Sequence, residues 1–157
     1  MDQDLKLAFI GGGNMAEAML AAVLSRGVTS PEMVTVSDIN PERRRHLAQR
    51  YGVKTTESNP EAAAGADVVV LAIKPQALPE VAKGLKGRLG PGQLLLSILA
   101  GTRLETLAAS LGHHAVVRAM PNTPAQIARG LTVWTAAPEV TPAQREQAIS
   151  ILGAMGQ

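Results

Sequence analysis

Short apolar segments alternate with longer amphipathic segments along most of the chain. The apolar runs have the length of strands buried in a parallel sheet, and the amphipathic runs repeat their apolar residues at helical spacing. This alternation predicts an α/β fold: a Rossmann-like, doubly wound and mostly parallel sheet with helices on both faces. We expect strands at residues 5–10, 34–37, 53–55, 68–73, 93–98, 115–119 and 130–135, and helices at 14–26, 79–89, 104–111 and 142–152, with two more beginning near 40 and 59.

Small polar residues and prolines mark where several of these helices begin. Asn40 and Asn59 each precede a proline, which suits the first helical position, so we expect both to cap their helices. Thr102 is the expected cap of the helix that follows it, and Thr141-Pro142 opens the last helix. Gly27 ends the first helix, because glycine tolerates the backbone conformation found there.

The composition indicates which classes of protein are compatible with this sequence. The 157 residues suggest one domain, and 46% of them are hydrophobic, enough for a sizeable core. Only 2% are aromatic, so that core must consist of alanine, valine, leucine and isoleucine. A net charge of +2 argues against nucleic-acid binding, and the lack of cysteine excludes disulfides and thiolate metal sites. Without a membrane-length apolar run or an ordinary signal peptide, the sequence predicts a cytoplasmic protein with no membrane partner.

The most informative stretch is a glycine turn between the first strand and the first helix, within residues 6–20. Gly11, Gly13 and Ala16 fill the three small positions of the dinucleotide-binding fingerprint. Gly11 permits a tight turn, Gly13 lets a pyrophosphate approach the backbone, and Ala16 lets the helix pack closely on the strand. The N-terminus of the helix then faces the phosphate charge, so we expect a dinucleotide here rather than a plain structural turn.

The end of the second strand carries Ser37 and Asp38, near the spacing expected for a residue that binds the adenosine ribose. Asp38 is also able to cap the turn at Asn40, and Ser37 is able to donate to a ribose oxygen or to a 2′-phosphate. The charge of Asp38 favours NAD, whereas a guanidinium among residues 43–45 favours NADP unless these arginines form a solvated helix face. The sequence leaves the choice between NAD and NADP open.

Two further segments follow strands and so lie at the edge of the sheet where ligands bind. Lys74 and Pro75 end the most apolar strand, so Lys74 either contacts the nicotinamide half of the cofactor or extends into solvent from an apolar stem. Residues 118–125 place Asn122 and Thr123 between two prolines. Such a stiff loop suits a substrate site, although a rigid turn without a ligand has the same composition.

The histidines and the tryptophan suggest no other site. His113 and His114 are expected to be a surface pair rather than metal ligands, since no third ligand is spaced to join them. His46 is expected to be solvated and Trp134 to lie in the core. No metal site, no arguable serine–histidine–aspartate arrangement and no Gly-Lys-Ser/Thr phosphate motif is found, so the chemistry is expected to be redox chemistry of the cofactor.

Three segments together resemble the signatures of the pyrroline-5-carboxylate reductases, in that family's order: residues 9–16, 72–75 and 118–125. The resemblance implies that a hydride passes from NADH or NADPH to the C=N carbon of Δ1-pyrroline-5-carboxylate, which gives L-proline. It also implies that Lys74 and Asn122 are the residues of this chain nearest the reaction, and hence the candidate catalytic residues. By the motifs or by this resemblance, the residues assigned to the cofactor are Ile10, Gly11, Gly12, Gly13, Asn14, Met15, Ser37, Asp38, Asn59, Ala72, Ile73, Lys74, Pro75, Ala100 and Gly101.

The resemblance also implies a missing part. Members of the family carry a C-terminal helical domain that forms the dimer and grips the substrate carboxylate, and residues 1–157 match only the cofactor domain. The apolar helical end at residues 149–155 has nothing left in the sequence to cover it, which suggests a chain cut at a domain boundary. We therefore expect this chain to bind cofactor but to lack reductase activity, and the full-length parent to be an active homo-oligomer.

Two other functions are compatible with the sequence. A related β-hydroxyacid or 6-phosphogluconate-type dehydrogenase shares the fold but has a different substrate loop and a catalytic lysine on a later helix. A non-catalytic module that senses redox state through a bound dinucleotide needs no rigid loop at residues 120–125.

Overall fold

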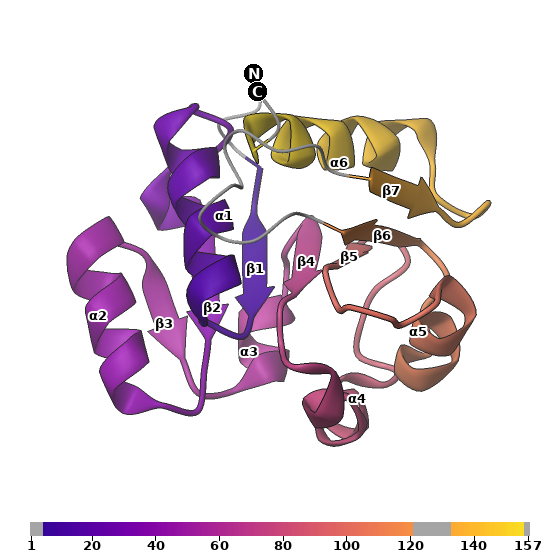
Figure 1. Cartoon of the computed structure of the whole chain (residues 1–157), viewed down its shortest axis with the longest axis horizontal. Helices are drawn as coiled ribbons and strands as arrows, with labels where there is room; N and C mark the ends of the chain where they lie inside the picture. The colour runs from indigo at the N-terminus through magenta and orange to yellow at the C-terminus, as the bar shows by residue number, and fades with distance from the viewer. Residues whose placement is uncertain (1–4, 121–132, 156–157) are drawn as a thin grey trace.

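The computed structural model describes residues 5–120 and 133–155. Seven strands form one sheet in the order β3-β2-β1-β4-β5-β6-β7 (Figure 1). All neighbours are parallel except β6 and β7, which are antiparallel, so the predicted doubly wound, mostly parallel sheet is confirmed. The strands are β1 (Leu7–Ile10), β2 (Val34–Ser37), β3 (Lys54–Thr56), β4 (Val68–Leu71), β5 (Leu94–Ser97), β6 (Val116–Met120) and β7 (Val133–Ala136).

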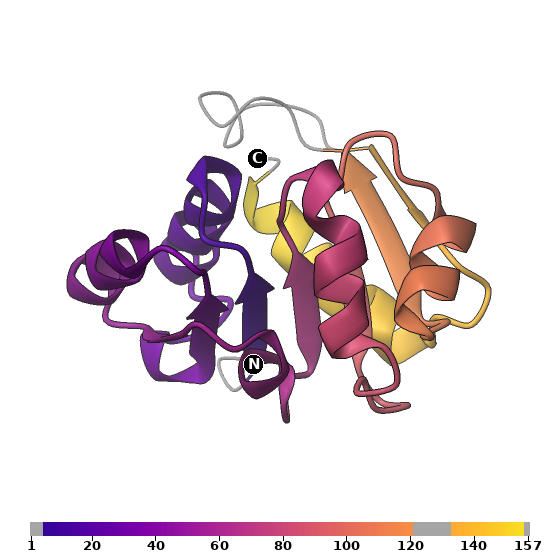
Figure 2. The ribbon, with the colours of Figure 1, turned by 90° about the horizontal axis from the view of Figure 1, so that it is seen from below.

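Helices cover both faces of this sheet (Figure 2). The helices are α1 (Asn14–Ser25), α2 (Pro41–Tyr51), α3 (Asn59–Ala63), α4 (Leu78–Leu85), α5 (Leu104–Leu111) and α6 (Pro142–Met155), with short 3-10 turns at Pro31–Met33 and Pro75–Ala77. The buried side chains form two clusters, one with α1, α2 and α6 and the other with α3, α4 and α5. Figure 2 accordingly shows α4 and α6 on opposite faces.

The chain changes direction across the sheet between β1 and β4. From β1 it proceeds outward to β2 and β3, then crosses back through α3 to β4 on the other side of β1. At such a switch point the loops after the two strands diverge, one to each face, and leave a crevice at their carboxyl ends. The glycine turn after β1 and residues 72–75 after β4 both lie at this crevice.

Aliphatic side chains make up most of the core, as the composition predicts. The four residues of β4 are fully buried, and Phe9 is the one phenylalanine of the chain. Ile151, Leu152 and Met155 of α6 are buried too, and α6 contacts α1. The expectation that this apolar end has nothing to cover it is therefore wrong, because α6 lies on the same face of the sheet as α1 and packs there.

Two of the expected helix caps are wrong. Ser58, not Asn59, caps α3: its hydroxyl accepts from the Glu61 N–H, while Asn59 is the first helical residue. Thr102 does not cap α5, because Arg103 holds the N-cap position without a side-chain cap, and the Thr102 hydroxyl donates to the Ala100 carbonyl. Asn40 does cap α2, accepting from two backbone N–H groups.

Several predicted boundaries differ by one to four residues: α4 ends at Leu85 rather than at residue 89, and α6 continues to Met155 rather than to residue 152. Thr141 and Gln144 form a reciprocal capping pair at the start of α6. Gly27 follows α1 with a positive φ of 71°, as expected of a glycine that ends a helix.

In the described parts of the chain, no helix has both the length and the apolar character needed to cross a membrane.

Candidate functional site

The glycine turn after β1 forms one wall of the site. Gly11 has a φ of +103°, and a Cβ atom there would lie 2.7 Å from the Ala72 carbonyl oxygen. Its N–H donates to the Ser37 carbonyl at 2.8 Å, which ties the turn to β2. Gly11 is therefore required both for its backbone conformation and for close contact with the segment after β4.

Gly13 has a different role, at the N-terminus of α1. It is the N-cap residue with an ordinary extended backbone, and no side chain caps this end of the helix. A Cβ atom on Gly13 would meet nothing within 4 Å. The N-terminus of α1 is thus uncapped and has open space beside Gly13, which is the arrangement that binds phosphate groups at helix N-termini. Ala16 is buried against the sheet, as the small-residue pattern predicts.

Gly12 couples the turn to β2 and α2. A Cβ atom there would lie 2.9 Å from a Leu47 methyl group of α2, so a larger residue would require that side chain to shift. The Gly12 N–H donates to the Asp38 carboxylate at 2.8 Å. Sequence reasoning assigned Gly12 to the cofactor through the resemblance, but it did not foresee these contacts, since the fingerprint leaves this position unrestricted.

Asp38 fills one of the two roles that the sequence left open, the turn at Asn40, and keeps acceptor positions for the other. One carboxylate oxygen accepts from Gly12, and the other accepts from the Asn40 N–H at 2.8 Å, which closes the turn into α2. The side chain is half-buried and lines the groove described below. A carboxylate has about four acceptor positions, so two remain for hydroxyl donors.

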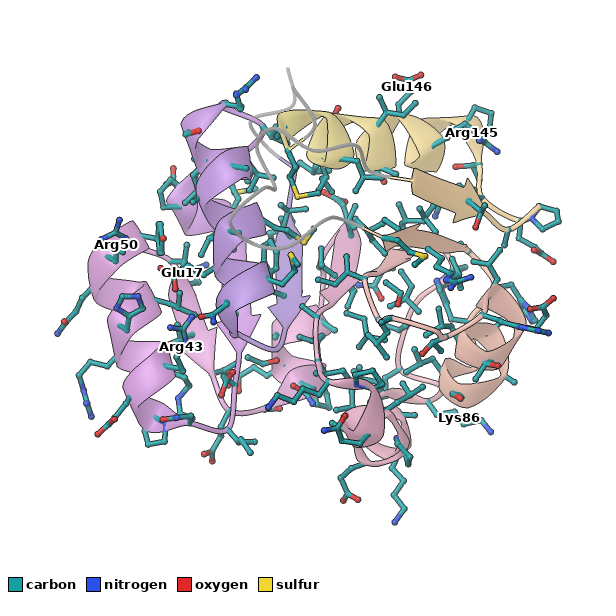
Figure 3. All side chains as sticks on the ribbon, viewed as in Figure 1. Glu17, Arg43, Arg50, Lys86, Arg145 and Glu146 are labelled. Atoms are coloured by element: carbon teal, nitrogen blue, oxygen red, sulfur yellow. The ribbon has the colours of Figure 1, made fainter. Side chains whose placement is uncertain are left out.

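Arg43 connects α2 to the glycine turn. Its guanidinium donates to the Gly12 carbonyl at 2.7 Å and, with a longer contact of 3.4 Å, to the Gly13 carbonyl. It also forms an ion pair with Glu17 of α1 at 2.8 Å. Figure 3 shows Glu17 and Arg43 in the space between α1 and α2. Arg43 is therefore not part of a solvated helix face, whereas Arg45 is exposed.

Glu17 collects several donors from α2. The Tyr51 hydroxyl donates to it at 2.7 Å, and His46 lies 3.1 Å from the same oxygen, so the exposed His46 has a partner as well as solvent. Burial alone raises the pKa of the Glu17 carboxyl, but hydrogen bonds from Tyr51, Arg43 and His46, together with the charge of Arg43, outweigh it and lower the pKa from 4.5 to about 2. Glu17 thus stays ionised and keeps Arg43 beside the glycine turn.

This pKa predicts an acid-sensitive contribution to stability. Because the folded pKa is below the unfolded one, the contribution is complete above about pH 4.5 and is lost as the pH falls toward 2. Between pH 5 and 2.5 we expect the free energy of unfolding of the wild type to fall by about 1–2 kcal/mol more than that of Glu17→Gln, allowing for solvent screening. Urea denaturation measures the difference. Glu146→Gln, at an exposed glutamate of α6, is the control; a wild type and a Glu17→Gln variant that lose equal stability would contradict the assignment.

A groove of about 500 Å³ runs between the glycine turn and the segment after β4. It brings together predicted residues from three separate stretches and adds Ile39, Asn40, Gln76 and Ala77, which sequence reasoning missed. Ile39 is 88% exposed, an unusual position for a large apolar side chain, and it lies directly after Asp38. The groove is lined by Gly11, Gly12, Gly13, Asp38, Ile39, Asn40, Arg43, Ala72, Ile73, Lys74, Gln76 and Ala77.

Several predicted residues do not line this groove. The Ser37 side chain is fully buried and donates to Asn59 at 2.6 Å, so each of these residues has the other as its partner. Ile10 is buried in β1, whereas Asn14, Pro75, Ala100 and Gly101 are exposed and Met15 is half-buried. Asn122 lies outside the described residues, as does the side chain of Trp134. Contact of Asn122 and of the other site residues named here with a cofactor or substrate stays a prediction, as does the core position of Trp134.

The histidine pair is not a surface pair. His113 is buried, with Nε2 at 2.6 Å from the Gln93 carbonyl oxygen, while His114 is exposed. Gln93 also donates to two carbonyls before β4, so His113 belongs to a hydrogen-bonded group that ties β5 to its neighbours. Among the residues that the structure describes, no group of three histidine or acidic side chains is placed to hold a metal ion.

The sheet topology, the uncapped N-terminus of α1 and the groove beside it define a dinucleotide-binding domain of the doubly wound class. The family model described as "NADP oxidoreductase coenzyme F420-dependent" matches residues 6–101. The chain belongs to this family.

The chain is similar to several proteins named pyrroline-5-carboxylate reductase. The chain is 43% identical to that of Pseudomonas aeruginosa over 152 residues, which is 96% of this chain and 55% of the relative. It is 40% identical to that of Synechocystis over 153 residues, covering 97% of this chain and 57% of the relative. The chain therefore spans a little over half the length of the curated relatives it matches, and the resemblance to this group is confirmed.

Solved structures agree with the sequence relatives. The pyrroline-5-carboxylate reductase of Coxiella burnetii superimposes with a TM-score of 0.91 at 34% identity, covering 98% of this chain and 57% of that one. The enzyme of Plasmodium falciparum, solved with NADP bound, has a TM-score of 0.86 at 24% identity, covers 99% and 57% of the two chains, and supports the fold alone.

Proposed function

We propose that the groove binds NADH or NADPH and that the chain supplies the cofactor-binding part of a reductase acting on Δ1-pyrroline-5-carboxylate. The observation that carries the proposal is the groove itself, where the open N-terminus of α1, Asp38 and residues 72–74 lie along one continuous surface. The relatives at up to 43% identity that are named for this reaction support the choice of substrate.

The residues present fit such a cofactor. The N–H groups at the start of α1 suit a pyrophosphate, and the two unused acceptor positions of Asp38 suit ribose hydroxyls. The exposed Ile39 offers an apolar surface to the adenine ring. At the other end of the groove, Ala72, Ile73 and Lys74 follow β4 and would lie toward the nicotinamide.

The bound cofactor would supply the hydride, and this chain would hold it in position. Lys74 is exposed at the groove and makes no side-chain hydrogen bond with the residues described, so its ammonium group is free to face the substrate. We keep Lys74, toward the nicotinamide, and Asn122, bordering the substrate, as the candidate catalytic residues. A rigid wall formed by residues 72–74 would orient the C=N carbon of the substrate against the cofactor, which is the main catalytic contribution expected here.

We further propose that dimerisation and the grip on the substrate carboxylate come from the part of the relatives that this chain does not span, and that the complete enzyme is a cytoplasmic homo-oligomer. The groove has three charged side chains, Asp38, Arg43 and Lys74. The first two are already paired, so this chain has few groups left to bind a substrate carboxylate.

A chimera tests the proposed reaction. In it, residues 1–155 replace the matching part of the Pseudomonas aeruginosa reductase, and cofactor oxidation and proline formation are measured with Δ1-pyrroline-5-carboxylate. We expect turnover by the chimera and cofactor binding without turnover by the 157-residue chain alone. Robust turnover by the chain alone would contradict the proposal that the substrate site needs the part of the relatives that this chain does not span. A chimera that binds cofactor and forms its oligomer, yet consumes none with this substrate, would favour a redox-sensing module or another dehydrogenase.

A further inference from the structure

We infer that the adenosine end of the groove selects NADH over NADPH, and that Asp38 is the residue that determines this preference. The inference rests on the proposed cofactor site and goes further by choosing between the two cofactors. It depends on Asp38 and Arg43, which line that corner of the groove, and on Arg44, which is bonded to the Asp38 backbone beside it.

The carboxylate of Asp38 is fixed in place. The Gly12 N–H holds one oxygen and the Asn40 N–H holds the other, both at 2.8 Å. The Asp38 backbone is anchored as well, since its N–H donates to the Thr56 carbonyl of β3. A carboxylate held at both oxygens cannot rotate away to make room for another anion. It can still accept hydrogen bonds from the 2′- and 3′-hydroxyls of a ribose, which are donors.

A 2′-phosphate would bring a charge of about −1.5 to −2 next to this carboxylate at pH 7. Recognition of that phosphate needs a guanidinium that is free to turn toward it. Arg43 is not free: it is bonded to the Gly12 and Gly13 carbonyls and paired with Glu17. Turning Arg43 toward a phosphate would break those contacts and leave Glu17 without its main ion-pair partner.

Arg44 is the cation that remains near the corner. Its guanidinium donates to the Asp38 backbone carbonyl at 2.7 Å and forms no salt bridge with any described acidic side chain. One guanidinium beside a fixed carboxylate offsets part of the repulsion without reversing it. Removing the charge of Asp38 would leave Arg44 unopposed, so the preference should then shift toward NADPH.

Calorimetric titration of the 157-residue chain with each cofactor tests the inference. We expect the wild type to bind NADH roughly tenfold or more tightly than NADPH, and Asp38→Asn to move the ratio of the two dissociation constants by about tenfold or more toward NADPH. Adding Arg44→Met to Asp38→Asn should weaken NADPH binding more than NADH binding. The ratio is the decisive readout, because damage to the glycine turn would weaken both cofactors together and leave it unchanged.

Glu42→Gln is the matched control, since it removes an acidic charge from the first turn of α2 at an exposed residue outside the groove lining. The ratio of its dissociation constants for NADH and NADPH should stay within about twofold of the wild-type ratio. A wild type that binds NADPH more tightly, or an Asp38→Asn ratio equal to that of the wild type, would overturn the inference while the proposed function stands. Binding of neither cofactor by the folded wild type would overturn the cofactor site, and this inference with it.

Discussion

Replacing Gly13 with glutamate is expected to abolish dinucleotide binding while the domain stays folded. The backbone of Gly13 is one that any residue adopts, and a side chain there would meet no protein atom within 4 Å, so the substitution should change stability by no more than about 1 kcal/mol. The same open space is where the pyrophosphate must lie. A carboxylate placed there blocks and repels it, and we expect affinity to fall on the order of 100-fold or more by calorimetry.

Gly153→Glu provides the matched control for that experiment. It adds the same side chain at an exposed glycine of α6 that also has nothing within 4 Å, but it lies outside the groove lining. Its cofactor affinity should equal that of the wild type. If Gly13→Glu bound NADH and NADPH as well as Gly153→Glu does, the pyrophosphate could not lie at the N-terminus of α1.

Replacing Gly11 with alanine is expected to have the opposite effect, a large loss of stability from one methyl group. Its φ of +103° is strained for alanine, and the new Cβ atom would lie 2.7 Å from the Ala72 carbonyl oxygen, which is backbone and cannot turn aside. The turn would have to move away from the segment after β4, so we expect the free energy of unfolding to fall by about 3 kcal/mol or more. Urea denaturation monitored by circular dichroism measures this loss.

Gly13→Ala is the natural comparison, because it adds the same methyl group two residues away in open space. Its free energy of unfolding should stay within about 1 kcal/mol of the wild type. Equal stability of the two alanine variants would show that the contact between Gly11 and Ala72 is not a tight one, and the described wall of the groove would be wrong.

Much of the fold could be predicted because its signals are local. The uniformly apolar β4 and the three leucines of β5 identify a parallel sheet with both faces covered, and the bounds of β2 and α5 match the predicted ranges. The predicted strand at residues 68–73 extends two residues beyond the observed end of β4 at Leu71. Ala72 and Ile73 continue the apolar run, but they leave the strand and line the groove instead.

The parts that could not be predicted depend on partners distant in the sequence. Asn59 has the sequence of a helix cap, yet its side chain is the acceptor for the buried Ser37 hydroxyl. Arg43 looks like one member of a solvated basic helix, and only the packing of α2 against α1 brings it to Glu17. His113 follows a helix and was expected at the surface, but its Nε2 atom contacts the Gln93 carbonyl oxygen. No local pattern encodes these pairs.

The central claim is that the groove between the glycine turn and residues 72–74 binds the dinucleotide. At 16.4 kDa the chain suits amide-resolved NMR, and titration with NADH provides the most direct measurement. We expect the largest shifts at the amides of Gly12, Gly13 and Asn14, with further shifts at residues 38–39 and 72–74. Shifts concentrated elsewhere, for example at the surface formed by His114 and Glu139, with the amides of the glycine turn unchanged, would contradict it.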